Sequence, residues 1–181
     1  MSAGHRAPPS SFADGQKRRI DLRCPGKNDR PAGEECERDA NRRRDVADAL
    51  CRMYDSFEHA DRAQGIPPAT PDACRSWVEG LLEGINVVAW HGTDAVGHAA
   101  LLEDRHGSHE LAVFVHPSFR GVGIGTETVQ ALLDLGRQSD VDRVWLSVAR
   151  TNRPAVSLYQ SLGFETTRAG GPEMEMELEL E

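Results

Sequence analysis

The chain has 181 residues, enough for one domain, and its 39% hydrophobic and 28% charged residues are ordinary for a globular protein. Its formal charge of −8 is unevenly spread, because residues 1–44 carry 11 Lys and Arg against 7 Asp and Glu, and the remainder carries 10 against 22. An acidic body argues against nucleic acid as a partner and favours cationic substrates. No apolar run approaches the roughly 20 residues that span a membrane. The chain also lacks a signal-peptide pattern, so we expect no membrane partner and a cytoplasmic protein.

The first 43 residues differ in composition from the rest of the chain. They contain few large apolar side chains and many Pro, Gly and Arg residues, which predicts a disordered basic tail. Within this tail only residues 18–23 (RRIDLR) alternate enough to predict a weak strand. Residues 44–181 are expected to form the single folded domain. The cysteines have neither zinc-site spacing nor the density of a disulfide-rich protein, so we expect free thiols at Cys24, Cys36, Cys51 and Cys74.

Apolar periodicity divides the first part of the domain into two helices and a hairpin. Residues 45–60 and 74–84 have apolar side chains at helical spacing, and the segment GIPPATP separates them. Residues 86–90 and 95–102 are apolar and strand-like, with the turn HGTD between them. This order predicts two helices followed by a β-hairpin.

The second part of the domain alternates strands with helices. Residues 109–115 (HELAVFV) and 143–149 (RVWLSVA) are apolar on both faces, as central strands are. A helix follows each of them, and the second helix is expected to begin at an Asn152 cap and to end at Gly163. Residues 174–180 (MEMELEL) alternate strictly, which predicts a strand with one face in water. The whole order predicts a mixed α/β sheet.

A glycine-rich loop separates the strand at 109–115 from the helix that follows it. Residues 119–125 (FRGVGIG) lead into the helix N-terminus, where unpaired amides and the helix dipole form an anion site. A Walker loop requires a lysine after the last glycine, and Thr126 stands there instead. A dinucleotide fingerprint requires a third glycine, which the spacing does not supply. The remaining alternatives are another kind of anion site and a plain tight turn.

Two motifs together resemble a known family. Arg120, Gly123 and Gly125 have the spacing Arg-x-x-Gly-x-Gly, and the segment NRPAVSLYQSLGF follows at residues 152–164. Both resemble signature segments of the GCN5-related N-acetyltransferases (GNAT), each in its strand–helix context. The resemblance is good over residues 86–164 and does not cover the tail. It implies the acyl-CoA N-acyltransferase fold, a mixed, mostly antiparallel central sheet flanked by helices.

The resemblance implies acetyl-CoA as the acyl donor. His106 and His109 have the spacing His-x-x-His, but they straddle a turn and a strand start rather than a helix, so we expect no metal. The diphosphate would bind the loop amides, and the backbone of Val113, Phe114 and Val115 would pair with the pantetheine arm. Asn152 matches the family's asparagine near the pantetheine, a role compatible with its N-cap position. Arg120 fits a phosphate contact and a surface charge equally well. The loop residues implied in cofactor binding are Arg120, Gly121, Val122, Gly123, Ile124, Gly125 and Thr126.

The resemblance also implies direct attack of an amine on the acetyl thioester. Tyr159 matches the tyrosine that protonates the departing thiolate, and it fits a core aromatic position as well. In the ribosomal-protein N-terminal acetyltransferases of this family a glutamate stands where this chain has Ser147, which argues against a peptide N-terminus as acceptor. Glu110 opens the strand at 109–115 and shares a face with Phe114. It is the remaining candidate for a general base, and otherwise a solvated strand-end carboxylate.

The acceptor site is implied to lie on the first two helices and the loop between them. This region mixes aromatic and charged side chains, which suits a polar amine of a small molecule or a protein; they are Tyr54, Phe57, Glu58, Asp61 and Arg62. Two other functions stay open, a non-catalytic acyl-CoA-binding module and a nucleotide-binding α/β protein. The sequence also leaves a homodimer open.

Overall fold

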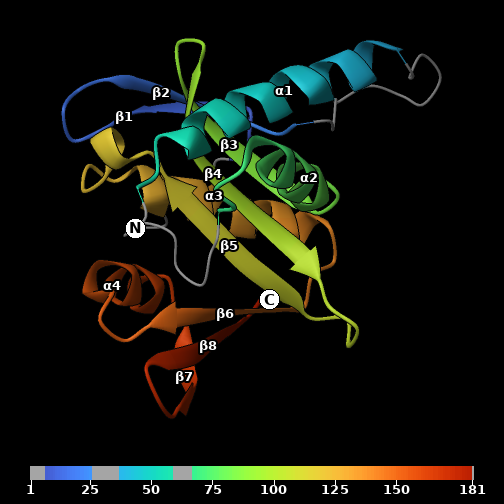
Figure 1. Cartoon of the computed structure of the whole chain (residues 1–181). Helices are drawn as coiled ribbons and strands as arrows, with labels where there is room; N and C mark the ends of the chain where they lie inside the picture. The colour runs from blue at the N-terminus through green and yellow to red at the C-terminus, as the bar shows by residue number, and fades with distance from the viewer. Residues whose placement is uncertain (1–6, 26–36, 59–66, 181) are drawn as a thin grey trace.

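The computed structural model describes residues 7–25, 37–58 and 67–180, and Figure 1 shows how their helices and strands are arranged. Within these residues eight strands form one sheet in the order β1-β2-β3-β4-β5-β6-β8-β7. All neighbouring strands are antiparallel except β5 and β6, which are parallel. The mixed, mostly antiparallel sheet that the sequence predicts is confirmed. The strands are β1 (Ser10–Ala13), β2 (Arg19–Arg23), β3 (Ile85–His91), β4 (Asp94–Glu103), β5 (His109–Val115), β6 (Arg143–Ala149), β7 (Glu165–Ala169) and β8 (Glu173–Glu179).

Helices cover both faces of this sheet (Figure 1). Successive strand residues point to opposite faces, so Val88 of β3 belongs to the core under α1 and α2, while Val87 and Ala89 belong to the core on the α3 side. This two-sided burial explains why the central strands are apolar on both faces. Across the described residues, no helix combines the length and the hydropathy needed to cross a membrane. The helices are α1 (Glu37–Asp55), α2 (Pro71–Leu81), α3 (Ile124–Gln138) and α4 (Arg153–Ser161).

Part of the N-terminal segment forms two strands of the sheet. The strand expected at residues 18–23 is present as β2, and β1, which the sequence did not predict, pairs with it. Ile20 and Leu22 are buried in the core on the α3 side, and β2 extends the sheet beyond β3. The expectation of a disordered tail over residues 1–43 is therefore wrong for residues 10–23, and also for residues 37–43, which form the start of α1. Two buried apolar side chains, Ile20 and Leu22, are enough to hold this segment on the sheet because they add to the edge of an existing core. The rest of the predicted tail, residues 1–6 and 26–36, lies outside the described residues.

Helix α1 ends earlier than its apolar pattern predicts. The pattern extends to residue 60, but the last helical residue is Asp55. The amide of Ser56 donates to the Met53 carbonyl at 3.2 Å and that of Phe57 donates to the Tyr54 carbonyl at 3.1 Å, which tightens the last turn. Phe57 keeps its place in the pattern because this turn folds it back into the core on the α1 side.

A buried hydrogen-bonded chain connects α1 to the sheet. The Asn86 amide nitrogen donates to the carbonyls of Leu81 and Gly84, at 2.8 and 2.7 Å, so its oxygen faces His98. That oxygen lies 2.7 Å from His98 Nε2, which must therefore carry the proton. Nδ1 of His98 then accepts from the Tyr54 hydroxyl at 2.7 Å. Burial lowers the pKa of His98 to about 3, so the ring stays neutral.

This neutral histidine should make stability depend on pH. In the unfolded chain His98 takes up a proton below its reference pKa of about 6.5, whereas in the folded chain it does so only near pH 3. Between these two pH values the unfolded state binds more protons, so the free energy of unfolding falls as the pH drops. We expect this one group to remove about 2 kcal/mol between pH 7 and pH 5. Urea unfolding at the two pH values, compared with His98→Gln, tests this. Equal losses in wild type and variant would contradict the assignment.

Candidate active site

Strands β5 and β6 are neighbours for only a short distance. They pair in parallel at His109 with Val144 and at Glu110 with Trp145, and then diverge (Figure 1). Beyond Glu110 the other edge of β5 remains paired with β4 as far as Val115. On its β6-facing edge no strand of the described chain pairs with residues 111–115. This edge offers backbone donors and acceptors to an extended ligand.

The glycine-rich loop follows the open end of β5. A short 3₁₀ turn (Pro117–Phe119) leads into it, and Gly121 and Gly123 have φ values of +73° and +95°. A Cβ at either glycine would have nothing within 4 Å, so conformation, rather than crowding, requires glycine here. Gly123 also stands at the N-cap of α3, where it supplies no side-chain acceptor.

The amides of this loop have no acceptor of their own. In the described part of the chain, no group accepts a hydrogen bond from the six consecutive amides from Gly121 to Thr126. The next amide, that of Glu127, donates to the Gly123 carbonyl at 3.1 Å. The amides from Gly123 to Thr126 are those that any helix N-terminus leaves unpaired, and the amides of Gly121 and Val122 extend the row. Such a row of donors suits an anion. A plain tight turn before a helix accounts for the last four of these amides, but not for those of Gly121 and Val122.

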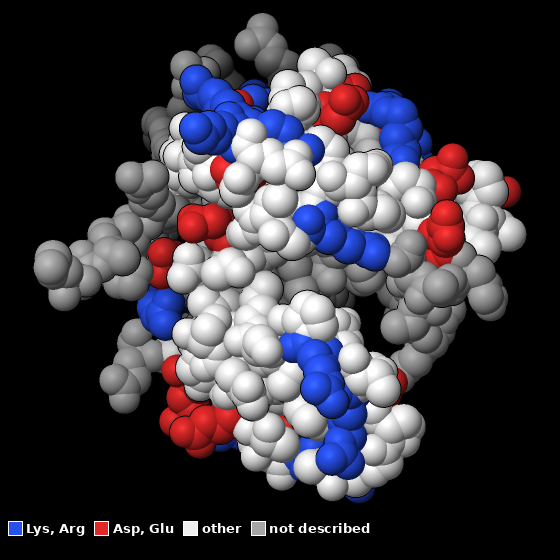
Figure 2. All heavy atoms as spheres, turned by 90° about the vertical axis from the view of Figure 1, so that its left-hand side faces the viewer, with Lys and Arg blue, Asp and Glu red and all other residues white. Residues whose placement is uncertain are grey.

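Basic side chains flank the end of the molecule at which the loop lies. Figure 2 looks onto this end and shows a hollow between an upper and a lower part, with Lys or Arg side chains on both. The chain has exposed arginines before the loop, at Arg120, and beside the start of α4, at Arg150 and Arg153. Arg120 has partners within the protein, since its Nε donates to the Val115 carbonyl at 3.1 Å and its guanidinium lies 5.2 Å from the Phe57 ring centroid. A phosphate contact for Arg120 stays a prediction.

Helix α4 brings the second motif next to the first. A Cβ at Gly125 would lie 3.4 Å from Val115 Cγ2 and 3.5 Å from Leu158 Cδ1, so α4 packs where β5 ends and α3 begins. Asn152 caps α4 by accepting from the Ala155 amide at 3.3 Å, as the sequence predicts. Its contact with the pantetheine stays a prediction.

Tyr159 lies on α4 directly after Leu158. Its side chain is 7% exposed within the core, and its ring contacts Phe164 at a centroid distance of 5.7 Å. Burial raises the pKa of Tyr159 to about 12. The phenol therefore keeps its proton at neutral pH, as a general acid must.

Two carboxylates lie on the faces of β5 and β8 that point toward the α1–α2 side. Glu110 is exposed at the start of β5, where partial desolvation and the charge of Asp104 raise its carboxyl pKa. Glu173 on β8 accepts a hydrogen bond from the Ser147 hydroxyl at 3.1 Å. Ser147 stands where the ribosomal-protein acetyltransferases have a glutamate, and the carboxylate of Glu173 lies beside it. Sequence reasoning missed Glu173: the alternation of MEMELEL indicates its wet face, but not which strand it pairs with.

The predicted acceptor residues are only partly at the surface. Tyr54 and Phe57 are 1% and 5% exposed and form an aromatic cluster with Trp77 and Phe114. They belong to the core under α1 and α2, so their expected direct contact with an acceptor is wrong. Glu58 is exposed, and residues 61 and 62 lie outside the described residues.

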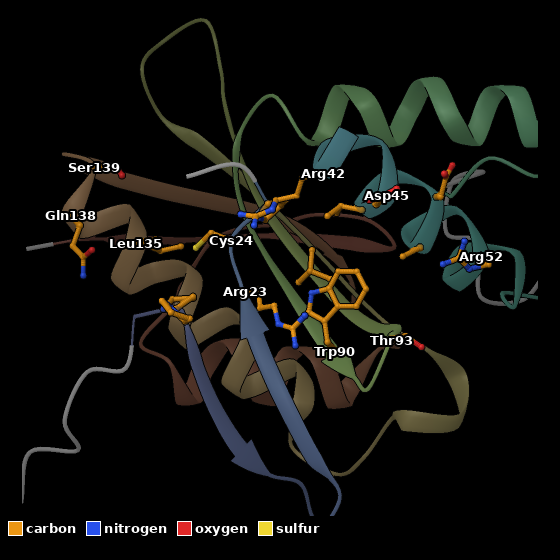
Figure 3. A pocket seen from close by; sticks show the side chains of 17 residues that line it. Arg23, Cys24, Arg42, Asp45, Arg52, Trp90, Thr93, Leu135, Gln138 and Ser139 are labelled. Carbon is orange, nitrogen blue, oxygen red and sulfur yellow. The ribbon is translucent and has the colours of Figure 1, made fainter. Parts of the chain in front are cut away.

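A separate cavity of about 770 Å³ lies between α1 and the β2–β3 edge (Figure 3). Trp90 and Arg23 line it, with the guanidinium 5.8 Å from the indole ring centroid. Figure 3 shows Arg42 and Arg52 of α1 on another side of it. Of the described residues that line the cavity, none belongs to the predicted site. It is not part of the candidate active site.

Comparison with known families decides the relationship of this chain. Residues 48–164 match the model of the Acetyltransferase (GNAT) family. The chain belongs to the GNAT family. The match covers the glycine-rich loop, β5, β6 and α4, which are the elements that form the candidate site. No curated protein has significant similarity to this GNAT chain.

Solved structures share the GNAT fold at low sequence identity. The GNAT domain of S. lividans PAT has a TM-score of 0.74 at 12% identity, over 94% of this chain and 96% of that one. The structure of yncA from Salmonella typhimurium, with its cofactor acetyl-CoA, has a TM-score of 0.61 at 21% identity, over 75% and 88%. A ribosomal-protein-alanine N-acetyltransferase from Brucella melitensis has a TM-score of 0.62 at 22% identity, over 74% and 94%. These similarities establish the fold alone.

Proposed function

We propose that this GNAT protein transfers the acetyl group of acetyl-CoA to a primary amine. The observation that carries the proposal is the row of unpaired amides from Gly121 to Thr126, next to the unpaired edge of β5. A diphosphate fits the amides, and an amide-containing arm fits the strand edge. Coenzyme A contains both groups in that order. The acetyl-CoA bound in the yncA structure supports the choice of donor.

The reaction needs three functions from the protein. The amine nitrogen attacks the thioester carbonyl carbon, so a C–N bond forms while the C–S bond breaks. The carbonyl oxygen becomes negative in between, and a backbone amide on the open edge of β5 stabilises it. The amine loses a proton to a base, and the departing thiolate takes the proton of Tyr159. The raised pKa of about 12 keeps the Tyr159 phenol protonated at neutral pH, and the phenolate left after the transfer regains its proton from solvent.

The base is assigned to Glu110, with Glu173 as the alternative that the structure adds. An alkylammonium with a reference pKa of about 10 is almost fully protonated at pH 7, so a proton acceptor raises the reactive fraction. Glu110 opens β5 on the same face as Phe114, and its raised carboxyl pKa makes it a better base than an ordinary glutamate. Glu173 lies on β8, which pairs with β6, and its carboxylate accepts from the Ser147 hydroxyl.

The acceptor is proposed to be cationic. Glutamates alternate along one face of β8, and this face continues across β6 through Ser147 and Trp145. Only two exposed arginines pair with these glutamates among the described residues, Arg143 with Glu179 and Arg168 with Glu175, both at 3.7 Å. An acidic face beside the diverging strands attracts a cationic amine by electrostatic steering. The β8 glutamates are Glu173, Glu175, Glu177 and Glu179.

Glu110→Gln tests the base. We expect turnover at pH 7 to fall by about 100-fold, and the loss to shrink toward pH 10, where the ammonium increasingly loses its proton without help from the protein. Glu173→Gln on β8, on the far side of β6, is the matched control, and it should leave turnover within about threefold of wild type. Free thiol released from acetyl-CoA measures both. A large loss in Glu173→Gln with none in Glu110→Gln would reverse the assignment.

A panel of amines, including diamines and lysine-containing peptides, tests the function itself. Wild-type protein should release thiol from acetyl-CoA only when a suitable amine is present. CoA binding without turnover on any amine would favour a non-catalytic CoA-binding module. Stabilisation against heat by ATP or NAD but not by CoA would favour a nucleotide-binding protein.

A further inference from the structure

The turn between β1 and β2 is stabilised by hydrogen bonds to the side chain of Asp14. The Asp14 carboxylate is fully buried and accepts from the amides of Gln16 and Arg18, at 2.9 Å each. It also accepts from Arg18 Nε at 2.7 Å, and the Lys17 amide closes the turn by donating to the Asp14 carbonyl at 2.8 Å. A turn with this many internal hydrogen bonds is a rigid support.

This turn rests directly on the glycine-rich loop. The Gly15 amide donates to the Val122 carbonyl at 2.9 Å. Beside it, the Arg18 guanidinium stacks over the ring of Phe119, 4.0 Å from the centroid. The segment that composition assigned to a disordered tail therefore contacts the proposed diphosphate site from behind.

The hydrogen bond from Gly15 fixes the direction of one loop amide. In a planar trans peptide, the carbonyl of one residue and the amide of the next point in opposite directions. Because the Val122 carbonyl points to Gly15, the Gly123 N–H points away from the β1–β2 turn. Glycines on both sides, Gly121 and Gly123, would otherwise let this peptide plane rotate at little cost.

We propose that the β1–β2 turn is a positioning element for coenzyme A: the Gly15 amide locks the Val122–Gly123 peptide so that the Gly123 N–H faces the diphosphate. The inference depends on the proposed function. Gly15 does not touch the ligand in this arrangement. The hydrogen bond from Gly15 raises the fraction of free protein molecules in which the Val122–Gly123 peptide already has the binding orientation. It therefore lowers the Kd for CoA.

Gly15→Pro removes this donor, and its ring carbon Cδ takes the place of the N–H, so the Val122 carbonyl must also move away. Residues 14–17 form a turn that the hydrogen bond from the Lys17 amide to the Asp14 carbonyl closes, and Gly15 is its second residue. Proline is favoured at this position of a turn. Gly15→Ala is the matched control, because it keeps the amide, and its Cβ would meet Val122 at an ordinary 3.5 Å. We expect a Kd for CoA about 5- to 10-fold higher in Gly15→Pro than in Gly15→Ala, measured by titration calorimetry.

A shorter donor separates positioning from general damage. S-acetyl-pantetheine lacks the diphosphate, so its kcat/KM should be equal in the two variants, whereas kcat/KM for acetyl-CoA should fall by the same 5- to 10-fold as the affinity. The kcat at saturating acetyl-CoA should not change. An equal loss with both donors, or equal CoA affinity in Pro and Ala variants, would overturn the inference. Failure of wild-type protein to bind CoA would instead refute the proposed function, and this inference with it.

Amide hydrogen exchange in wild-type protein tests the same coupling if Gly15→Pro does not fold. By reciprocity, CoA must stabilise the hydrogen bond that favours its binding. Saturating CoA should slow exchange at Gly15 by about fivefold or more. The Gln16 amide, bonded to Asp14 rather than to the loop, is the internal control and should respond less. Unchanged exchange at Gly15 on CoA binding would overturn the inference.

Discussion

Tyr159→Phe is expected to lower kcat for acetyl transfer by a factor of 10² to 10⁴, the usual contribution of a positioned general acid. The hydroxyl is the only group removed, and the ring keeps its packing against Phe164. KM for acetyl-CoA should change little, because the phenol acts on the thiolate that forms during the reaction. The measurement is steady-state thiol release under conditions where chemistry limits the rate.

Two controls separate this role from a structural one. The melting temperature of Tyr159→Phe should stay close to that of wild type, since the ring remains buried in the core. Because burial raises the pKa of Tyr159 to about 12, wild-type kcat should show no decline from ionisation of this phenol below about pH 10. Unchanged kcat in the variant would make Tyr159 a core aromatic residue and nothing more.

Gly123→Ala is expected to raise the Kd for CoA on the order of 100-fold. An alanine is strained at a φ of +95°, so the loop shifts and its amides lose their common direction. Loss of one or two hydrogen bonds to a charged diphosphate, at about 1.5–3 kcal/mol each, accounts for this magnitude. Titration calorimetry with CoA measures it.

The matched control for strain is Gly171→Ala in the turn between β7 and β8. Gly171 has a φ of +94°, and a Cβ there would likewise have nothing within 4 Å. Both variants should lose similar stability to heat, but only Gly123→Ala should lose CoA affinity. Equal affinity losses in the two would show that strain, rather than the direction of the loop amides, weakens binding.

The parts of the fold and site that the sequence predicts are those encoded locally. The positive φ of Gly121 and Gly123 and the cap at Asn152 depend on neighbouring residues, so their motifs identify them. Two-sided apolar runs identify β5 and β6 because central strands are buried on both faces.

The parts that the sequence does not predict depend on pairing between distant segments. Strand β7 was missed because all five of its residues are exposed, so no apolar alternation marks it. The proximity of Glu173 to Ser147 follows from the register of β6 with β8, which neither strand encodes alone. The contact of Gly15 with Val122 likewise requires β2 to pair with β3. Tyr54 was assigned to the acceptor site because helical spacing alone does not distinguish a core position from a substrate contact.

Titration of ¹⁵N-labelled protein with CoA, followed through its backbone amides, tests the central claim most directly. The account predicts that the amides from Gly121 to Thr126 show the largest shifts, and that pantetheine, which lacks the diphosphate, leaves them unchanged while still shifting amides of β5. Saturable CoA binding that leaves these six amides at their free positions would contradict it.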